Sequence, residues 1–160
     1  MGCGKKFESG NCVADILRDI VDAQNDIVEN CCDTGCEQSI GDLLGEKENG
    51  NGLDTVPVIL YCDCKPFKGF GAERKAKHGH FGMGEIISSF IFRVKSVDKD
   101  NCAVLELLLS DGQGCGHDSL KDPTDQVTKK LEATGICITV DLDCFCHVTC
   151  LPAISVFNND

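Results

Sequence analysis

The longest run of alternating apolar and polar residues lies near the C-terminus, over residues 136–152. Polar residues fill most of the positions between its apolar ones, with Cys137 and Phe145 as the exceptions. This period of two predicts one long, half-buried β-strand. Three cysteines on the same face indicate that the strand bonds to something across that face. The apolar positions change from aliphatic to thiol side chains along the run: Ile136, Ile138, Val140, Leu142, Cys144, Cys146, Val148 and Cys150.

A second pattern, with helical spacing, occupies residues 12–29 and predicts an amphipathic helix. Asn11 is the expected N-cap, and Asn30 and Gly35 are expected to end the helix. Residues 1–10, with Gly, Lys and polar residues around Cys3, predict a flexible N-terminal arm. We expect residues 11–160 to form a single cysteine-rich assembly domain. The apolar face of the helix consists of Val13, Ile16, Leu17, Ile20, Ile27 and Val28.

Strand patterns dominate the rest of the chain. Residues 55–62 predict a strand, and Pro57 requires either an edge position or a start at residue 58. Two further strands, over residues 86–97 and 102–110, are expected to form a hairpin because four polar residues join them. The segments expected to lack regular structure are a thiol-rich turn at 31–36 and loops at 41–54, 65–85 and 111–130.

These elements predict an α+β fold that is mainly β. One N-terminal helix is followed by an antiparallel β-sheet or sandwich in a single domain. The chain of 160 residues is long enough for one such domain with a sizeable core.

The charge is acidic overall and unevenly distributed. A net charge of −11 argues against nucleic acid as a partner. Residues 1–55 hold 12 acidic and 4 basic residues, whereas residues 65–81 hold 5 basic residues and 1 acidic residue. We expect this mobile basic loop to contact the acidic N-terminal half of a neighbouring copy. Its bases are Lys65, Lys68, Arg74, Lys75 and Lys77.

We expect the protein neither to span a membrane nor to be exported through a signal peptide. No segment is long and apolar enough to span a bilayer, and the N-terminus lacks the apolar run of a secretory signal.

Cysteine is far more frequent than in an ordinary protein. The chain has 13, so a fully paired monomer is excluded, and at least one thiol is free, metal-bound or bonded to another chain. Because the cytosol keeps thiols reduced, the cysteines either bind metal or are oxidised after synthesis. The candidates for disulfides or cross-links are Cys3, Cys12, Cys31, Cys32, Cys36, Cys62, Cys64, Cys102, Cys115, Cys137, Cys144, Cys146 and Cys150.

Metal binding and thiol catalysis both find weak support in the spacing. Zinc sites commonly use Cys-x2-Cys pairs, and this chain has none. Cys12 lies at the predicted helix start, where a thiol pKa is lowered, but no histidine stands out as its base. We expect no catalytic residue, cofactor or metal, and keep a zinc-stabilised binding module as the alternative.

Extended geometry restricts the disulfides. Residues two apart in a strand lie about 6.5–7 Å apart, whereas bridged cysteines prefer Cα atoms about 5.5–6 Å apart. Cys144 and Cys146 therefore bridge each other poorly, as do Cys62 and Cys64. Each is expected to find its partner on another strand, loop or molecule.

The C-terminal run resembles a family signature. Cys137-Ile-Thr-Val-Asp-Leu-Asp-Cys-Phe-Cys-His-Val-Thr-Cys-Leu151 is similar to the end of the cysteine-rich outer spore-layer proteins, the CotY/CotZ/ExsY type of crust and exosporium proteins. Further motifs agree in order along nearly the whole chain. They are Met1-x-Cys3, Asn11-Cys12-Val13, Cys32-Asp-Thr-Gly-Cys36, Thr55-Val-Pro-Val-Ile-Leu-Tyr61, Ile91-Phe-Arg-Val-Lys-Ser-Val-Asp98 and Asn101-Cys-Ala-Val-Leu105.

The resemblance implies a structural, non-enzymatic function. Such proteins self-assemble from hexameric units into hexagonal sheets in the outer layer of the endospore, the crust or the exosporium basal layer. Disulfides between subunits reinforce the sheets, which carry other coat and exosporium proteins. The resemblance also implies synthesis in the mother-cell cytoplasm without a signal peptide, followed by oxidation as the spore matures.

Overall fold

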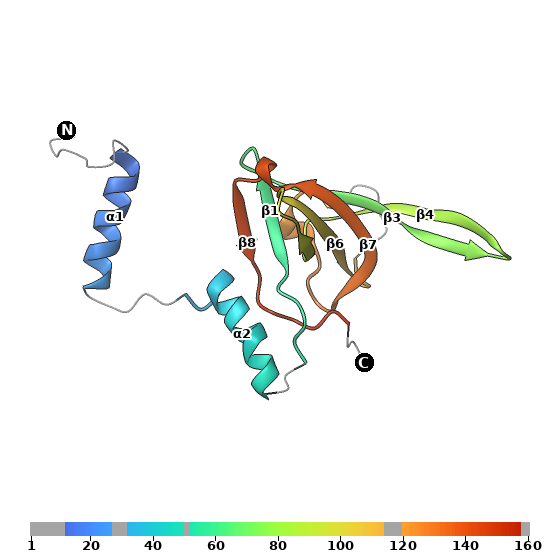
Figure 1. Cartoon of the computed structure of the whole chain (residues 1–160), viewed down its shortest axis with the longest axis horizontal. Helices are drawn as coiled ribbons and strands as arrows, with labels where there is room; N and C mark the ends of the chain where they lie inside the picture. Colours follow the sequence, from blue (N-terminus) through green and yellow to red (C-terminus); the bar gives the residue numbers. More distant parts are fainter. Residues whose placement is uncertain (1–11, 27–31, 50–51, 114–119, 158–160) are drawn as a thin grey trace. The chain divides into compact units, whose positions relative to one another are not determined.

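The computed structural model describes residues 12–26, 32–49, 52–113 and 120–157 (Figure 1). Residues 1–33 and 34–160 form two compact units, and each is considered by itself. The predicted arm at residues 1–10 and three of the candidate cysteines, Cys3, Cys31 and Cys115, lie outside the described residues.

The described part of the first unit is helix α1, Cys12–Asn25, which confirms a helix at the predicted place. None of its residues is buried. Arg18 forms an ion pair with Asp15, at 3.0 Å between Nη1 and Oδ1. The apolar face is exposed along the length of the helix, at Val13, Ile16, Leu17, Ile20 and Val21.

The second unit is built on one curled antiparallel sheet (Figure 1). Its strands run in the order β2, β1, β5, β6, β7, and β8 pairs with β1. The strands are β1 Val58–Cys62, β2 Lys65–Pro66, β5 Phe92–Val97, β6 Cys102–Ser110, β7 Leu131–Asp141 and β8 His147–Cys150. The antiparallel, mainly β class is thus confirmed, with one curled sheet in place of two stacked ones. The start of β1 directly after Pro57 and the β5–β6 hairpin are also as predicted. The strand expected over residues 86–97, however, is divided between β5 and a separate strand that ends at Ser89.

Apolar residues pack on both faces of the sheet. One cluster is centred on Phe92, Leu105 and Leu107, which are fully buried, and Phe67, Ile138 and Phe145 pack against it. A smaller cluster is formed by Ile59, Ile91, Leu108, Leu131 and Val156. The C-terminal segment therefore closes the second face of the sheet.

The prediction of one long strand over residues 136–152 is wrong. A short 3-10 turn, η2 Leu142–Cys144, separates β7 from β8. Asp141 caps this turn, because its carboxylate accepts a hydrogen bond from the Asp143 N–H at 2.9 Å. The turn changes the direction of the side chains, so Phe145 packs inward while Cys144 and Cys146 are exposed.

A second helix, α2 Cys36–Asn49, replaces the turn and most of the loop expected between residues 31 and 54. Its sequence contains two glycines and few apolar residues, and no strong periodicity identifies it. Tertiary contacts hold it instead: Ser39 is buried and donates a hydrogen bond to the Leu151 carbonyl at 2.7 Å.

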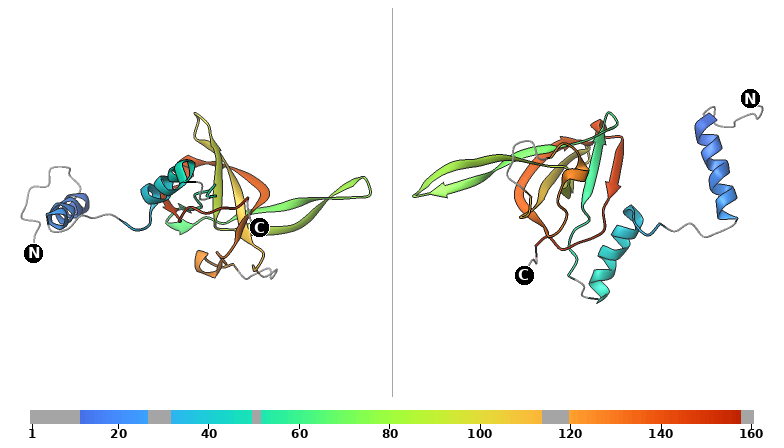
Figure 2. Two further views of the ribbon diagram at one scale, coloured as in Figure 1. Left: turned by 90° about the horizontal axis from the view of Figure 1, so that it is seen from below. Right: turned by 180° about the vertical axis from the view of Figure 1, so that it is seen from behind.

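The prediction of a mobile basic loop at residues 65–85 is also wrong, because these residues form strands. After β2, strands β3 Gly69–Lys77 and β4 His80–Ser89 pair in a long hairpin. His78 and Gly79 both have positive φ, as a tight two-residue hairpin turn requires. Both views in Figure 2 show this hairpin extending away from the curled sheet. The expected loop at 111–130 contains only the short 3-10 turn η1, Pro123–Asp125, among its described residues.

Candidate cross-linking site

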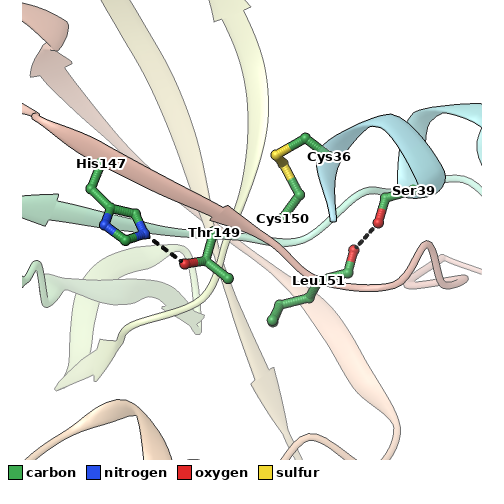
Figure 3. Close-up of a disulfide and its surroundings, with 6 residues drawn as sticks. All are labelled: Cys36, Ser39, His147, Thr149, Cys150 and Leu151. Atoms are coloured by element: carbon green, nitrogen blue, oxygen red, sulfur yellow. Dashed lines mark hydrogen bonds between the residues drawn. A yellow bond between two sulfur atoms is a disulfide. The ribbon is translucent and has the colours of Figure 1, made fainter. Parts of the chain in front are cut away.

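Cys36 and Cys150 form a disulfide between the start of α2 and the end of β8, with Cα atoms 4.8 Å apart (Figure 3). The bridge closes a sequence separation of 114 residues. Ser39 and Leu151 join the same two elements one turn further on (Figure 3). Covalent and hydrogen bonds together thus fasten α2 to the edge strand of the sheet.

A second pair of sulfur atoms meets at the other end of β1. The Cys62 and Cys144 thiols lie 3.5 Å apart, brought together from β1 and η2. Backbone bonds position both segments, since the Cys146 N–H donates to the Tyr61 carbonyl at 3.0 Å. Two thiols from separate elements are thus brought within contact of each other.

The surroundings of Cys62 raise the pKa of its thiol. The hydrogen bond to Cys144 contributes most, followed by partial desolvation and by the negative charges of Cys144, Asp63 and Cys146. Forming a thiolate at Cys62 is therefore less favourable than in an isolated cysteine.

Exposed thiols are distributed over several elements of the described chain. Cys64 stands in the two-residue β1–β2 turn, where both it and Asp63 have positive φ. Cys102 begins β6, and Cys137 lies on β7. The exposed set is Cys32, Cys64, Cys102, Cys137, Cys144 and Cys146, while Cys12 lies half-buried in α1.

No group of three or more His, Cys, Asp or Glu side chains that could hold a metal ion occurs among the described residues. His147 instead stacks on Tyr61, with ring centroids 4.2 Å apart. Its Nε2 also lies 3.2 Å from the Thr149 hydroxyl (Figure 3).

The basic residues predicted to act together fall into separate positions. Lys65 is in β2, and Lys68 donates a hydrogen bond to the Leu120 carbonyl. Arg74 and Lys75 are exposed on β3, where the Arg74 guanidinium lies 5.5 Å from the centre of the Phe81 ring. Lys77 ends β3, and its side chain lies outside the described part of the structure.

Sequence reasoning did not identify the Cys36–Cys150 pairing. Cys36 was expected in a turn and Cys150 in a long strand, and no local signal connects residues so far apart. An exposed aromatic and aliphatic face on the β3–β4 hairpin was missed with the hairpin itself.

The described chain is thus that of a mainly β, cysteine-rich protein with an internal disulfide and several exposed thiols. The sequence profile of the Spore coat protein Z family matches residues 1–153. The chain is 34% identical over 152 residues to Spore coat protein Z of Bacillus subtilis (strain 168), a match that covers 90% of each chain. It therefore belongs to the Spore coat protein Z family. No solved structure matches significantly, and no described helix is long and apolar enough to cross a membrane.

Proposed function

We propose that this protein is a structural building block of the outer spore layer, the crust or the exosporium basal layer. Copies self-associate into hexameric units and then into a two-dimensional hexagonal lattice. Disulfides between copies reinforce that lattice, and other coat or exosporium proteins attach to it. Synthesis takes place in the mother-cell cytoplasm, and oxidation follows as the spore matures.

One observation carries this proposal: six exposed thiols accompany a single internal disulfide in the described chain. A bridge contributes about 2–4 kcal/mol to folding, and the Cys36–Cys150 bond already connects the two ends of the second unit. Further bonds add little to such a core. Between copies, the same bonds make an assembly covalent and resistant to denaturants.

The positions of the exposed thiols suit bonds between copies. They occur on the β1–β2 turn, at the start of β6 and on β7, so they are spread over separate elements of the sheet. A sheet-like lattice requires contacts with more than one neighbour, and thiols on separate elements can supply them.

The test is air oxidation of the purified protein, followed by denaturing gels with and without reductant. We expect a ladder of oligomers that collapses to monomer on reduction, together with hexagonal arrays in negative-stain images. Serine variants at Cys64, Cys102 and Cys137 should shorten the ladder. As the matched control, the pair Cys36→Ser and Cys150→Ser should leave it intact.

Two results would refute the proposal. A monomer band in both lanes after oxidation contradicts the covalent part. Dispersed particles under every assembly condition contradict the lattice.

A further inference from the structure

We propose that helix α1 of one copy docks on the outer face of the β3–β4 hairpin of the next copy. This inference rests on the proposed self-assembly and names the two surfaces that meet. Each surface is apolar and exposed among the described residues, and the two carry opposite charge.

The hairpin has one apolar face directed away from the core. Alternation along β3 places Phe70, Ala72, Arg74 and Ala76 on one face. Their partners across the hairpin are Ser88, Ile86, Met83 and Phe81, and a register shift between Ala72 and Arg74 keeps Ile86 and Met83, three residues apart on β4, opposite residues of this face. Four large side chains on this face are exposed: Phe70 at 60%, Phe81 at 75%, Met83 at 74% and Ile86 at 64%.

The opposite face of the hairpin is already used at its base. Gly69 and Gly71 lie against Phe92 and Ile136, and Ile87 packs against the core. The base is thus fixed while the outer face is open. Because a two-stranded hairpin is marginally stable alone in water, an apolar cover over its outer part is stabilising.

Helix α1 offers a surface of matching character. Val13, Ile16, Leu17, Ile20 and Val21 follow helical spacing on one side, and each is between 45% and 67% exposed. An acidic row, which includes Asp19 and Asp22, occupies the other side. Such a helix requires a partner for its apolar side.

Charge selects the pairing of unlike surfaces. The hairpin Gly69–Ser89 holds 3 basic and 2 acidic residues, whereas α1 holds 3 acidic residues and 1 basic residue. A helix on a hairpin therefore brings together segments of opposite net charge, which also speeds association.

The proposed self-assembly makes a neighbouring copy the partner of α1. One such helix and one such hairpin per chain make a head-to-tail contact, which closes into a ring where the rotation between copies permits and otherwise extends into a filament.

Photo-crosslinking of mixed isotopic copies tests the contact. The full chain carries p-benzoylphenylalanine at Phe81, and nitrogen-14 and nitrogen-15 copies are mixed before assembly and irradiation. We expect light–heavy cross-links from position 81 to residues 12–25. The control is the same group at Phe157, which is 54% exposed in the C-terminal segment and should not react with α1.

A second measurement uses Leu17→Glu and Ile20→Glu, which should slow assembly at least about tenfold. Val97→Glu, at a comparably exposed site, should not. Cross-links that join only light to light or heavy to heavy chains would overturn the docking between copies. Cross-links from position 81 to other residues in an intact lattice would also overturn the docking, but would leave the proposed function unaffected. Light–heavy links to α1 without any lattice would support the docking and refute the lattice.

An independent observation, the 3.5 Å approach of two sulfur atoms, points to a second internal disulfide between Cys62 and Cys144. Each thiol loses its proton, the sulfur atoms bond, and two electrons pass to dioxygen, which becomes hydrogen peroxide. This bridge would join β1 to η2, whose positions backbone bonds already fix. It would withdraw Cys62 and Cys144 from cross-linking and leave Cys64 and Cys146 beside them.

Non-reducing peptide mapping of the same isotopic mixture tests this bridge. We expect the Cys62–Cys144 peptide pair as light–light and heavy–heavy species only. Because a raised pKa leaves less Cys62 thiolate at neutral pH, the bond should form faster as the pH is increased. Alkylated Cys62 and Cys144 in protein whose Cys36–Cys150 bond has formed would overturn the bridge. Light–heavy Cys62 peptides would do the same.

Discussion

Gly71 lies so close to Ile136 that a Cβ atom at residue 71 would stand 2.3 Å from the Ile136 Cγ2. Strand β3 thus crosses β7 at a distance that only glycine permits. This crossing fixes the base of the hairpin that we propose as a docking arm.

Gly71→Ala should lift the hairpin from β7 and lower the free energy of unfolding by about 1–3 kcal/mol, since the core has no room for the methyl group. Urea unfolding measures the loss, and faster tryptic cleavage at Arg74 and Lys75 reports the release. Gly82→Ala is the matched control, because its nearest neighbour would be the Lys75 carbonyl at 3.8 Å. Equal behaviour of the two variants would contradict the close crossing.

Removal of the internal disulfide should weaken the second unit as a whole. The pair Cys36→Ser and Cys150→Ser should lower the free energy of unfolding by about 2–5 kcal/mol, because the bridge restricts a long loop in the unfolded chain. Reductant should lower the stability of the wild type by at least a similar amount, and should affect the double variant less, because only a Cys62–Cys144 bond could still be reduced there. Cys102→Ser, at an exposed thiol, serves as the control. A double variant as stable as the oxidised wild type would count against this bond.

Acid should loosen the C-terminal segment. Burial raises the pKa of Asp54, but hydrogen bonds from the Val156 N–H, the Thr55 hydroxyl, the Phe157 N–H and the Ser155 hydroxyl outweigh it and lower the pKa below 3.8. A lowered pKa in the folded state means that this stabilisation is present above pH 3.8 and is lost as the pH falls through the folded value.

Asp54→Asn should therefore cost about 1 kcal/mol at neutral pH, a low figure because the site is half-exposed. It should also flatten the acid limb of a plot of stability against pH. Asp111→Asn, at an exposed turn, is the comparison. An unchanged acid limb in Asp54→Asn would show that other carboxylates cause the loss.

Glu106 is buried and forms an ion pair with Lys95, with 3.8 Å between Nζ and Oε1. The other carboxylate oxygen accepts a hydrogen bond from the Gly135 N–H at 2.9 Å. Lys95→Met should lower the free energy of unfolding by about 1–3 kcal/mol, because it leaves a buried charge without a counterion. Adding Glu106→Gln should restore much of this loss, and a double-mutant cycle in urea measures the coupling. Losses that simply add would show that the pair does not interact.

Local patterns were sufficient where sequence neighbours determine the structure. The polar residues 98–101 predict the β5–β6 hairpin, and helical spacing predicts α1. Helix α2 was missed because residues far along the chain, Cys150 and Leu151, hold it in place. The β3–β4 hairpin was missed because its turn, His78-Gly79, lies in a Lys- and Gly-rich segment that is typical of a loop.

The candidate site shows the same division. Alternation predicts that Cys144 and Cys146 bridge each other poorly, but this prediction assumed one extended strand, which η2 interrupts. The actual proximity of Cys62 and Cys144 depends on η2, which Asp141 caps. The period-two pattern predicts a strand that continues through η2. The directions of the Phe145 side chain and of the thiols after it could therefore not be predicted.

The position of β1 determines when the protein can finish folding. This early strand pairs with β8, the last strand of the described chain, and Asp54 just before it binds residues 155–157. Until β8 has been made, one edge of β1 has no partner, and Cys36 has no Cys150 to bond. Folding of this unit is therefore completed only after almost all of its residues are available, although β1 is made early.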